Sequence, residues 1–282
     1  MKKEEVIREF QKDSLQKLPD KDLLFLIESY VTIRNDYDNI ANLVRGDEDI
    51  IGKMIDNDRV FDKVMNCTDR ILEISPYFLF MLFLKRAFKE KRRDREFIEK
   101  TIEVLNGTDP ATPWNKKRLL SLLEDSQVSN YIANILTQFT KSSRLFKIRE
   151  AEKESYQYIV DMIADSLRSD NNRKFYIYCH IGNYTLFLTG MFPEYIEYRY
   201  ERKRRSVDKQ YYIDFGKTYY ALASEHTNVR GNRLSGTLSY LSEGFEVVAQ
   251  VLHFMNGEYL FPKKGKFKEK SANHFVSDEN EN

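Results

Sequence analysis

Apolar residues recur along this chain at the three- and four-residue spacing of amphipathic helices, with no convincing strand-like alternation between them. The pattern is clearest over 22–44, where an apolar stripe runs from Leu23 to Val44 and Gly46 is placed to end the helix. The same spacing predicts helices at about 4–18, 76–105, 115–124, 127–140, 147–168, 173–189, 193–205, 208–225 and 234–255, with shorter helical pieces at 48–56 and 58–73. We therefore expect an all-α protein, a multi-helix bundle of about ten helices.

The helix expected over 76–105 differs from the others because it opens with an unbroken apolar run, Tyr77–Leu84. Ser75 can cap the free backbone N–H groups at its start, and Pro76 suits the first helical position, where no N–H is needed. A helix that is apolar on every face has no side left for water, so we expect this run to lie at the centre of the bundle.

Two segments interrupt or end the helical pattern. The clearest loop is 108–114, which contains Pro110 and Pro113. It predicts two packed sub-bundles, an N-terminal one over 1–107 and a tyrosine-rich C-terminal one over 108–261. Residues 262–282 are rich in lysine, serine, asparagine and acidic residues, so we expect a disordered polar tail there.

Composition agrees with an all-α fold and narrows the class of protein. Only 11 glycines and 6 prolines occur in 282 residues, and a β-rich fold would need more of both for its turns. The 45 Lys and Arg residues nearly balance the 44 Asp and Glu residues, which argues against a globally basic nucleic-acid coat or a strongly acidic tail protein. The first residues have no apolar signal-peptide core, no run approaches the roughly 20 apolar residues of a membrane span, and the two cysteines are far apart. We expect a cytoplasmic protein with no membrane contact.

Four stretches form a pattern that spans about 70–225: Ile74–Ala87, Tyr131–Phe139, Gly182–Pro193 and Tyr211–Gly216. This pattern resembles an uncharacterised family of bacterial helical proteins. The resemblance implies a bacterial, cytosolic, helical protein. It brings no assigned activity, ligand or catalytic residue.

Tyrosine is concentrated in one part of the chain, since 12 of the 18 tyrosines lie between Tyr156 and Tyr220. Many come as close pairs: Tyr156/Tyr158, Tyr176/Tyr178, Tyr198/Tyr200, Tyr211/Tyr212 and Tyr219/Tyr220. Adjacent residues on a helix point about 100° apart, so these rings cannot all face the core. The pattern fits an aromatic-walled pocket or stacking surface, and it equally fits a tyrosine-rich core whose hydroxyls reach the surface.

Aromatic and basic residues alternate over 195–205, a composition that suits single-stranded nucleic acid or another anionic ligand. The candidate binding residues are Tyr198, Arg199, Tyr200, Arg202, Arg204, Arg205, Tyr211 and Tyr212. A second basic run, 85–95, holds seven cations and two acids. Either run can also be a solvated helix face whose cations complement the helix dipole.

One catalytic pattern is present. Arg173 and His180 match the Arg-x6-His signature and resemble the HEPN class of helical ribonucleases. A seven-residue step places both side chains on one helix face, where the imidazole can act as general base while the arginine stabilises a pentavalent phosphate. Tyr184 lies one turn beyond His180, and Lys174 follows the arginine where that class often has another polar residue. The alternative interpretation is a chance match, because the signature is only two residues long.

Metal and cofactor motifs are absent from the sequence. No histidine follows a Glu-x-x-His or His-Glu-x-x-His pattern, and the calcium-loop start at Asp47 lacks an oxygen ligand where Ile51 stands. We expect neither a metal nor a cofactor. Gly182 lies inside a predicted helix between His180 and Tyr184, which marks either a pocket wall or a tight helix contact.

These observations favour a non-catalytic binding or interaction module that works through a surface around 173–220. Its expected partner is another protein or a second copy of the chain, with an anionic ligand or RNA as the weaker possibility. The alternatives are a metal-independent ribonuclease that uses Arg173 and His180, and a structural homo-oligomer whose tyrosines form the interface.

Overall fold

The computed structural model describes residues 9–10, 12–31, 36–66, 74–108, 113–202 and 207–261, with the side chain of Arg202 left out. Within these ranges the chain forms fourteen α-helices, short 3₁₀ and π turns, and no strand, which confirms the all-α bundle. The number exceeds ten partly because three of the long predicted helices, those over 22–44, 76–105 and 234–255, are each divided in two. The expected disordered tail, 262–282, lies outside the described residues.

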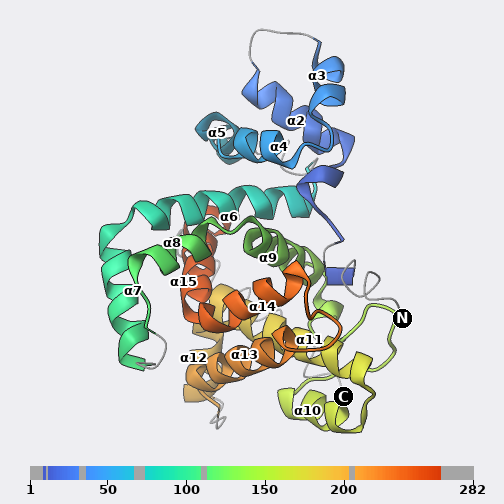
Figure 1. Ribbon diagram of the computed structural model, residues 1–282, viewed down its shortest axis with the longest axis vertical. Helices are drawn as coiled ribbons and strands as arrows, with labels where there is room; N and C mark the ends of the chain where they lie inside the picture. Colours follow the sequence, from blue (N-terminus) through green and yellow to red (C-terminus); the bar gives the residue numbers. More distant parts are fainter. Residues whose placement is uncertain are drawn as a thin grey trace.

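Four short helices form a separate group at the top of Figure 1. They are α2 (Asp20–Tyr30), α3 (Tyr37–Val44), α4 (Glu48–Ile55) and α5 (Asp58–Asn66), and we call residues 20–66 the N-terminal lobe. Its buried apolar residues belong to the same core cluster as those of the rest of the molecule; they include Leu23, Leu26, Ile27, Ile51, Met54, Ile55, Val60 and Val64. A 3₁₀ turn, Leu15–Lys17, precedes it and packs on α4.

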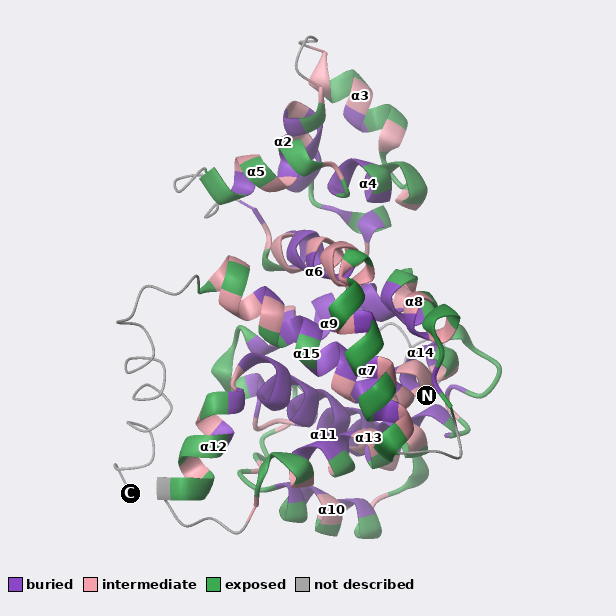
Figure 2. Cartoon of the chain, turned by 90° about the vertical axis from the view of Figure 1, so that its left-hand side faces the viewer, coloured by how far each residue is buried: buried purple, intermediate pink, exposed green. Residues whose placement is uncertain are grey.

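Helix α6 (Pro76–Arg93) lies between the lobe and the rest of the molecule, which we call the body (Figures 1 and 2). The Ser75 hydroxyl accepts a hydrogen bond from the Phe78 N–H and caps the helix as its sequence predicts. The apolar run that follows is largely buried because α6 contacts α9 (Ser126–Phe139) and α15 (Phe245–Met255) on one side and α5 on the other.

The predicted division of the chain at 107/108 stays a prediction. Helices α7 (Arg95–Thr108) and α8 (Lys116–Glu124) flank the body, and hydrogen bonds between Asn106 and the backbone of Trp114 close the connection between them. Helix α6 belongs to the expected N-terminal sub-bundle, yet it packs against helices from beyond residue 108.

The body is built around α11 (Asn171–Met191), which is buried almost continuously from Phe175 to Met191 (Figure 2). Around it lie α10 (Ile159–Arg168), α12 (Pro193–Arg202), α13 (Lys209–Ser224), α14 (Arg233–Glu243) and α15. Its closest neighbour is α13, because Gly182 on α11 leaves room for the ring of Tyr220, and Gly216 on α13 leaves room for the hydroxyl of Thr185 on α11.

In the part of the chain that is described, no helix is both long enough and apolar enough to cross a membrane. The cytoplasmic location stays a prediction.

Candidate interaction surface

The tyrosine-rich segment divides into a buried set and an exposed set. Tyr176, Tyr212, Tyr219 and Tyr220 are buried, whereas Tyr156, Tyr178 and Tyr211 are half-buried. Tyr158, Tyr198 and Tyr200 are exposed. The closely spaced tyrosine pairs therefore contribute rings both to the core and to the surface, which are the two arrangements that the sequence pattern allowed.

One member of the buried set, Tyr220, shares an amide acceptor with a buried tyrosine of α9. Tyr131 on α9 and Tyr220 on α13 each donate a hydrogen bond to Oδ1 of Asn183 on α11, at 3.0 and 2.9 Å. Both phenols are completely buried, which raises the pKa of each well above its usual value. Because both of these hydroxyls have an acceptor on α11, this network ties α9, α11 and α13 together inside the core.

Two half-buried rings and one buried ring form a row along α13, which we call the aromatic ladder. It comprises Tyr211, Phe215 and Tyr219, spaced by four residues and therefore on one face of the helix. Ring centroids are 4.4 Å apart for the first pair and 6.0 Å for the second. Tyr178 of α11 packs beside Tyr219 at 5.5 Å, and Leu222, 42% exposed, continues the ladder toward the end of the helix.

Helix α12 presents two further exposed rings. Tyr198 and Tyr200 are 45% and 49% exposed, and α12 packs against both α11 and α13. The guanidinium of Arg199 lies 5.4 Å from the ring centroid of Tyr195. Arg204, Arg205 and the side chain of Arg202 lie outside the described residues, so the cationic half of this candidate site stays a prediction.

Arg173 is held by the protein's own acids. Its guanidinium bonds Asp165 of α10 at 2.7 Å, Glu152 at 2.7 Å and the Tyr156 hydroxyl at 3.0 Å. These contacts attach the segment before α10 to α11. They also occupy the donors that a phosphate would need, so Arg173 contributes to structure in this conformation.

His180 is buried on the same helix and has different neighbours. Its Nε2 lies 3.1 Å from the Leu145 carbonyl oxygen, its ring meets the edge of Phe139, and Tyr184 stacks nearby. Burial lowers the pKa of His180 to about 4, against the raising effect of the bond to Leu145. Since a carbonyl oxygen only accepts, Nε2 carries the proton and cannot act as a base. The geometry therefore gives the ribonuclease hypothesis no support.

Gly182 marks helix packing rather than a pocket. A Cβ atom added at Gly182 would lie 2.7 Å from ring atoms of Tyr220, closer than side chains approach one another. The missing side chain is therefore filled by a neighbouring aromatic ring. Of the two alternatives considered for Gly182, this contact fits the tight helix packing.

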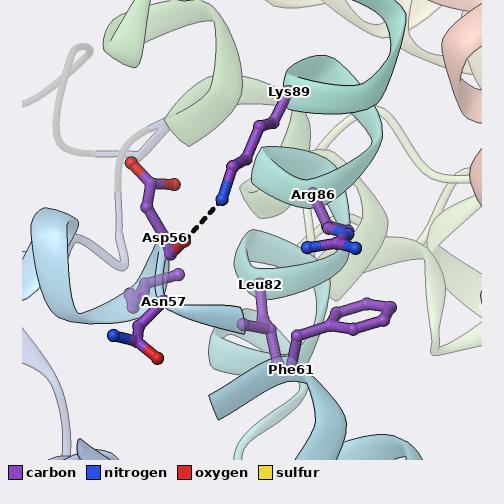
Figure 3. Close-up of a pocket in the computed structure, with 7 residues that line it drawn as sticks. Asp56, Asn57, Phe61, Leu82, Arg86 and Lys89 are labelled. Carbon is purple, nitrogen blue, oxygen red and sulfur yellow. Dashed lines mark hydrogen bonds between the residues drawn. The ribbon is translucent and has the colours of Figure 1, made fainter. Parts of the chain in front are cut away.

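The second basic run, at the end of α6, is also matched by acids. Lys85 lies 3.4 Å from Asp56. Lys89 lies 3.1 Å from Asp58, which Arg86 bonds as well. Further along, Lys91 pairs with Asp94 and Arg92 with Glu124. A small cavity beside Arg86 and Lys89 has room for about one water molecule (Figure 3). Five of the seven cations of this run, Lys85, Arg86, Lys89, Lys91 and Arg92, are therefore paired with acids of the chain itself.

The described residues contain no group of three or more histidine, cysteine or acidic side chains placed to hold a metal ion. Cys179 is buried, and burial raises the pKa of its thiol, which opposes its use as a nucleophile.

No protein-family model, curated protein or solved structure matches this chain. The resemblance to a bacterial family therefore stays a prediction.

Proposed function

We propose that this protein is a non-catalytic interaction module that binds a protein partner through the surface of α12 and α13. We use the name α12–α13 face for the partly exposed aromatic and apolar residues of these two neighbouring helices: Tyr198 and Tyr200, which are two residues apart and point to different sides of α12, and Tyr211, Phe215 and Leu222 of α13. The observation that carries the proposal is the aromatic ladder. Its rings contact one another along α13 and pack against the core, and the exposed side chain of Leu222 extends the row.

Such a face suits association because its rings are held before a partner arrives. Phe215 stacks between Tyr211 and Tyr219, so little side-chain freedom is left to lose on binding. Tyrosine also offers a large apolar area together with a hydroxyl that can bond a partner at the rim. Aromatic side chains are enriched at protein interfaces for these reasons.

The charges around the face favour a protein over a polyanion. The segment 193–220 carries five acidic residues among its seven basic ones, and three of the acids, Glu194, Glu197 and Glu201, lie on α12 itself. A phosphate backbone would meet these acids as well as the cations, whereas a protein surface of mixed charge can match both.

The test compares two sets of substitutions in the host of this protein. The variant Y198S/Y200S removes two exposed rings from the face, and Y158S removes an equally exposed ring near α10 as the control. After cross-linking and affinity purification, we expect a specific partner to be lost with the double variant and kept with Y158S. Equal recovery of every protein by all three forms would contradict the proposal. Melting temperatures should agree closely, because the substituted side chains are exposed.

The same face gives a second candidate function, a homo-oligomer whose copies bury these rings against each other. Sedimentation of the purified protein over a range of concentrations distinguishes the two. Self-association that Y198S/Y200S weakens and Y158S leaves unchanged identifies a second copy as the partner. Binding of a single-stranded RNA that weakens as salt rises would instead support an anionic ligand.

A further inference from the structure

The lobe and α6 carry opposite charge where they meet. Residues 20–66 contain 11 acidic and 6 basic side chains, a net charge of −5. The second half of α6 and the residues just after it, 85–95, contain seven basic and two acidic side chains. Although the chain as a whole is nearly neutral, an acidic lobe therefore contacts a basic stretch of α6.

The opposite charges meet at the turn between α4 and α5. The Asp58 carboxylate accepts hydrogen bonds from Nη1 of Arg86 and from Nζ of Lys89. Lys89 also donates to the backbone oxygen of Asp56 at 2.9 Å, the contact drawn as a dashed line in Figure 3. Nζ of Lys85 lies 3.4 Å from the Asp56 carboxylate and 3.4 Å from the Gly52 oxygen. Three cations of α6 thus hold one short turn of the lobe.

These acids are open to water. The side chains of Asp56 and Asp58 are 43% and 64% exposed. The hydrogen bonds and charge of Lys89, followed by those of Arg86, lower the pKa of Asp58, so it stays ionised at neutral pH. Ion pairs at such positions are individually weak, and dissolved salt screens them strongly.

Beneath the ion pairs lies a small aromatic contact. Phe61 of α5 packs against Phe83 of α6 and Tyr259 of the C-terminal π turn, with ring centroids 6.0 and 5.0 Å apart, and the Arg86 guanidinium covers Phe61 at 4.8 Å. When this edge of the lobe moves away, Phe61 and the underlying part of α6 become exposed to water.

The opposite edge of the lobe is attached differently. Asp22 is completely buried, and its carboxylate accepts hydrogen bonds from the backbone N–H and the hydroxyl of Ser75 at the start of α6. Phe25 meets Phe78 edge to face next to it. Salt screens a buried contact of this kind much less. One edge of the lobe is therefore anchored by buried groups and the other by exposed charges.

We propose that the ion pairs between the α4–α5 turn and α6 form an electrostatic latch, which sets how often this edge of the lobe lifts and uncovers α6. The latch is independent of the α12–α13 face. Rising ionic strength loosens it while the Asp22 edge stays attached.

Hydrogen exchange followed by mass spectrometry tests the latch directly. Sodium chloride is raised from about 10 mM to about 1 M, which shortens the screening length from about 30 Å to about 3 Å. We expect the amides of α5 and of the second half of α6 to exchange about two- to five-fold faster in high salt, the factor that weak surface ion pairs provide. The exchange rates of amides in peptides from α2 and α11 should change little.

Substitutions separate the latch from a general effect of salt. D58N should reproduce the faster exchange in low salt, whereas D62N, an equal charge change at an exposed position on the same helix, should not. D58K should loosen the contact further, and D58K/K89E should restore part of the protection because the pair is re-formed with its charges exchanged. Equal behaviour of D58N and D62N, no response to salt, or no rescue by the double variant would each overturn the proposal.

Discussion

The N-terminal lobe and the body show two ways in which helices are held together. In the body, α11 has 21 residues and is surrounded by other helices, so its polar side chains find their partners inside the protein. The helices of the lobe have 8 to 11 residues, and the lobe meets α6 partly through exposed carboxylates. Substitutions in the body should therefore change the free energy of unfolding strongly. Substitutions at the exposed ion pairs of the lobe should change it little, and by an amount that depends on salt.

The largest effect is expected at Asn183, the shared acceptor of two buried hydroxyls. Asn183→Ala leaves Tyr131 and Tyr220 without that acceptor, at about 1–3 kcal/mol for each buried group. We expect the free energy of unfolding to fall by roughly 4 kcal/mol, measured by urea denaturation. The control, Asn228→Ala, removes a more exposed amide and should cost under about 0.5 kcal/mol. Similar losses for the two variants would show that the Asn183 network contributes little to the stability of the body.

The next largest effect on stability is expected at His180, and this effect depends on pH. Its pKa is about 4 in the folded protein and about 6.5 when unfolded, so the unfolded chain binds more protons between these values. Stability therefore falls as the pH drops below about 6.5, and the loss from this group is complete below about 4, at about 3 kcal/mol. His180→Gln should flatten the decline over this window, measured by urea denaturation at successive pH values. An unchanged slope would mean that His180 is accessible to protons in the fold.

A pair of glycines tests how closely the helices of the body pack. Gly182→Ala would force a methyl group against Tyr220, and we expect a loss of about 1–3 kcal/mol. Gly236 on α14 has open space where its Cβ would lie, so Gly236→Ala should instead stabilise by about 0.5–1 kcal/mol through helix propensity. Thermal unfolding of both variants shows whether each substitution lowers or raises the stability. A neutral Gly182→Ala would show that α11 and α13 can separate at little cost.

The smallest effect is expected in the lobe. Arg45 pairs with Asp20 at 2.7 Å on an exposed surface. Arg45→Ala should change the free energy of unfolding by less than about 0.5 kcal/mol, and high salt should remove even that difference. A loss above about 2 kcal/mol that persists in high salt would overturn the contrast between the two regions.

The predicted helices were largely correct because helical periodicity and end signals are local. Ser75 before Pro76 and Asp208 before Lys209 cap their helices as such residues do in isolation. The long helix expected over 22–44 is divided into α2 and α3, since a continuous apolar pattern does not show where a chain bends. The candidate site was less predictable. The spacing of Tyr211 and Phe215 indicates a shared helix face, whereas whether Tyr219 or Tyr220 lies deeper depends on α11 and α15.

The sequence by itself determined the all-α class, most helix positions and the concentration of tyrosine in one region, because these follow from residue spacing and composition. Only the tertiary structure decided what each side chain meets. It paired Arg173 with Asp165, buried His180 against Leu145, and matched the cations of α6 with Asp56 and Asp58 of the lobe. The physical reason is that burial and electrostatic interaction depend on distances in space, and residues from different segments of the chain become neighbours only when the helices pack.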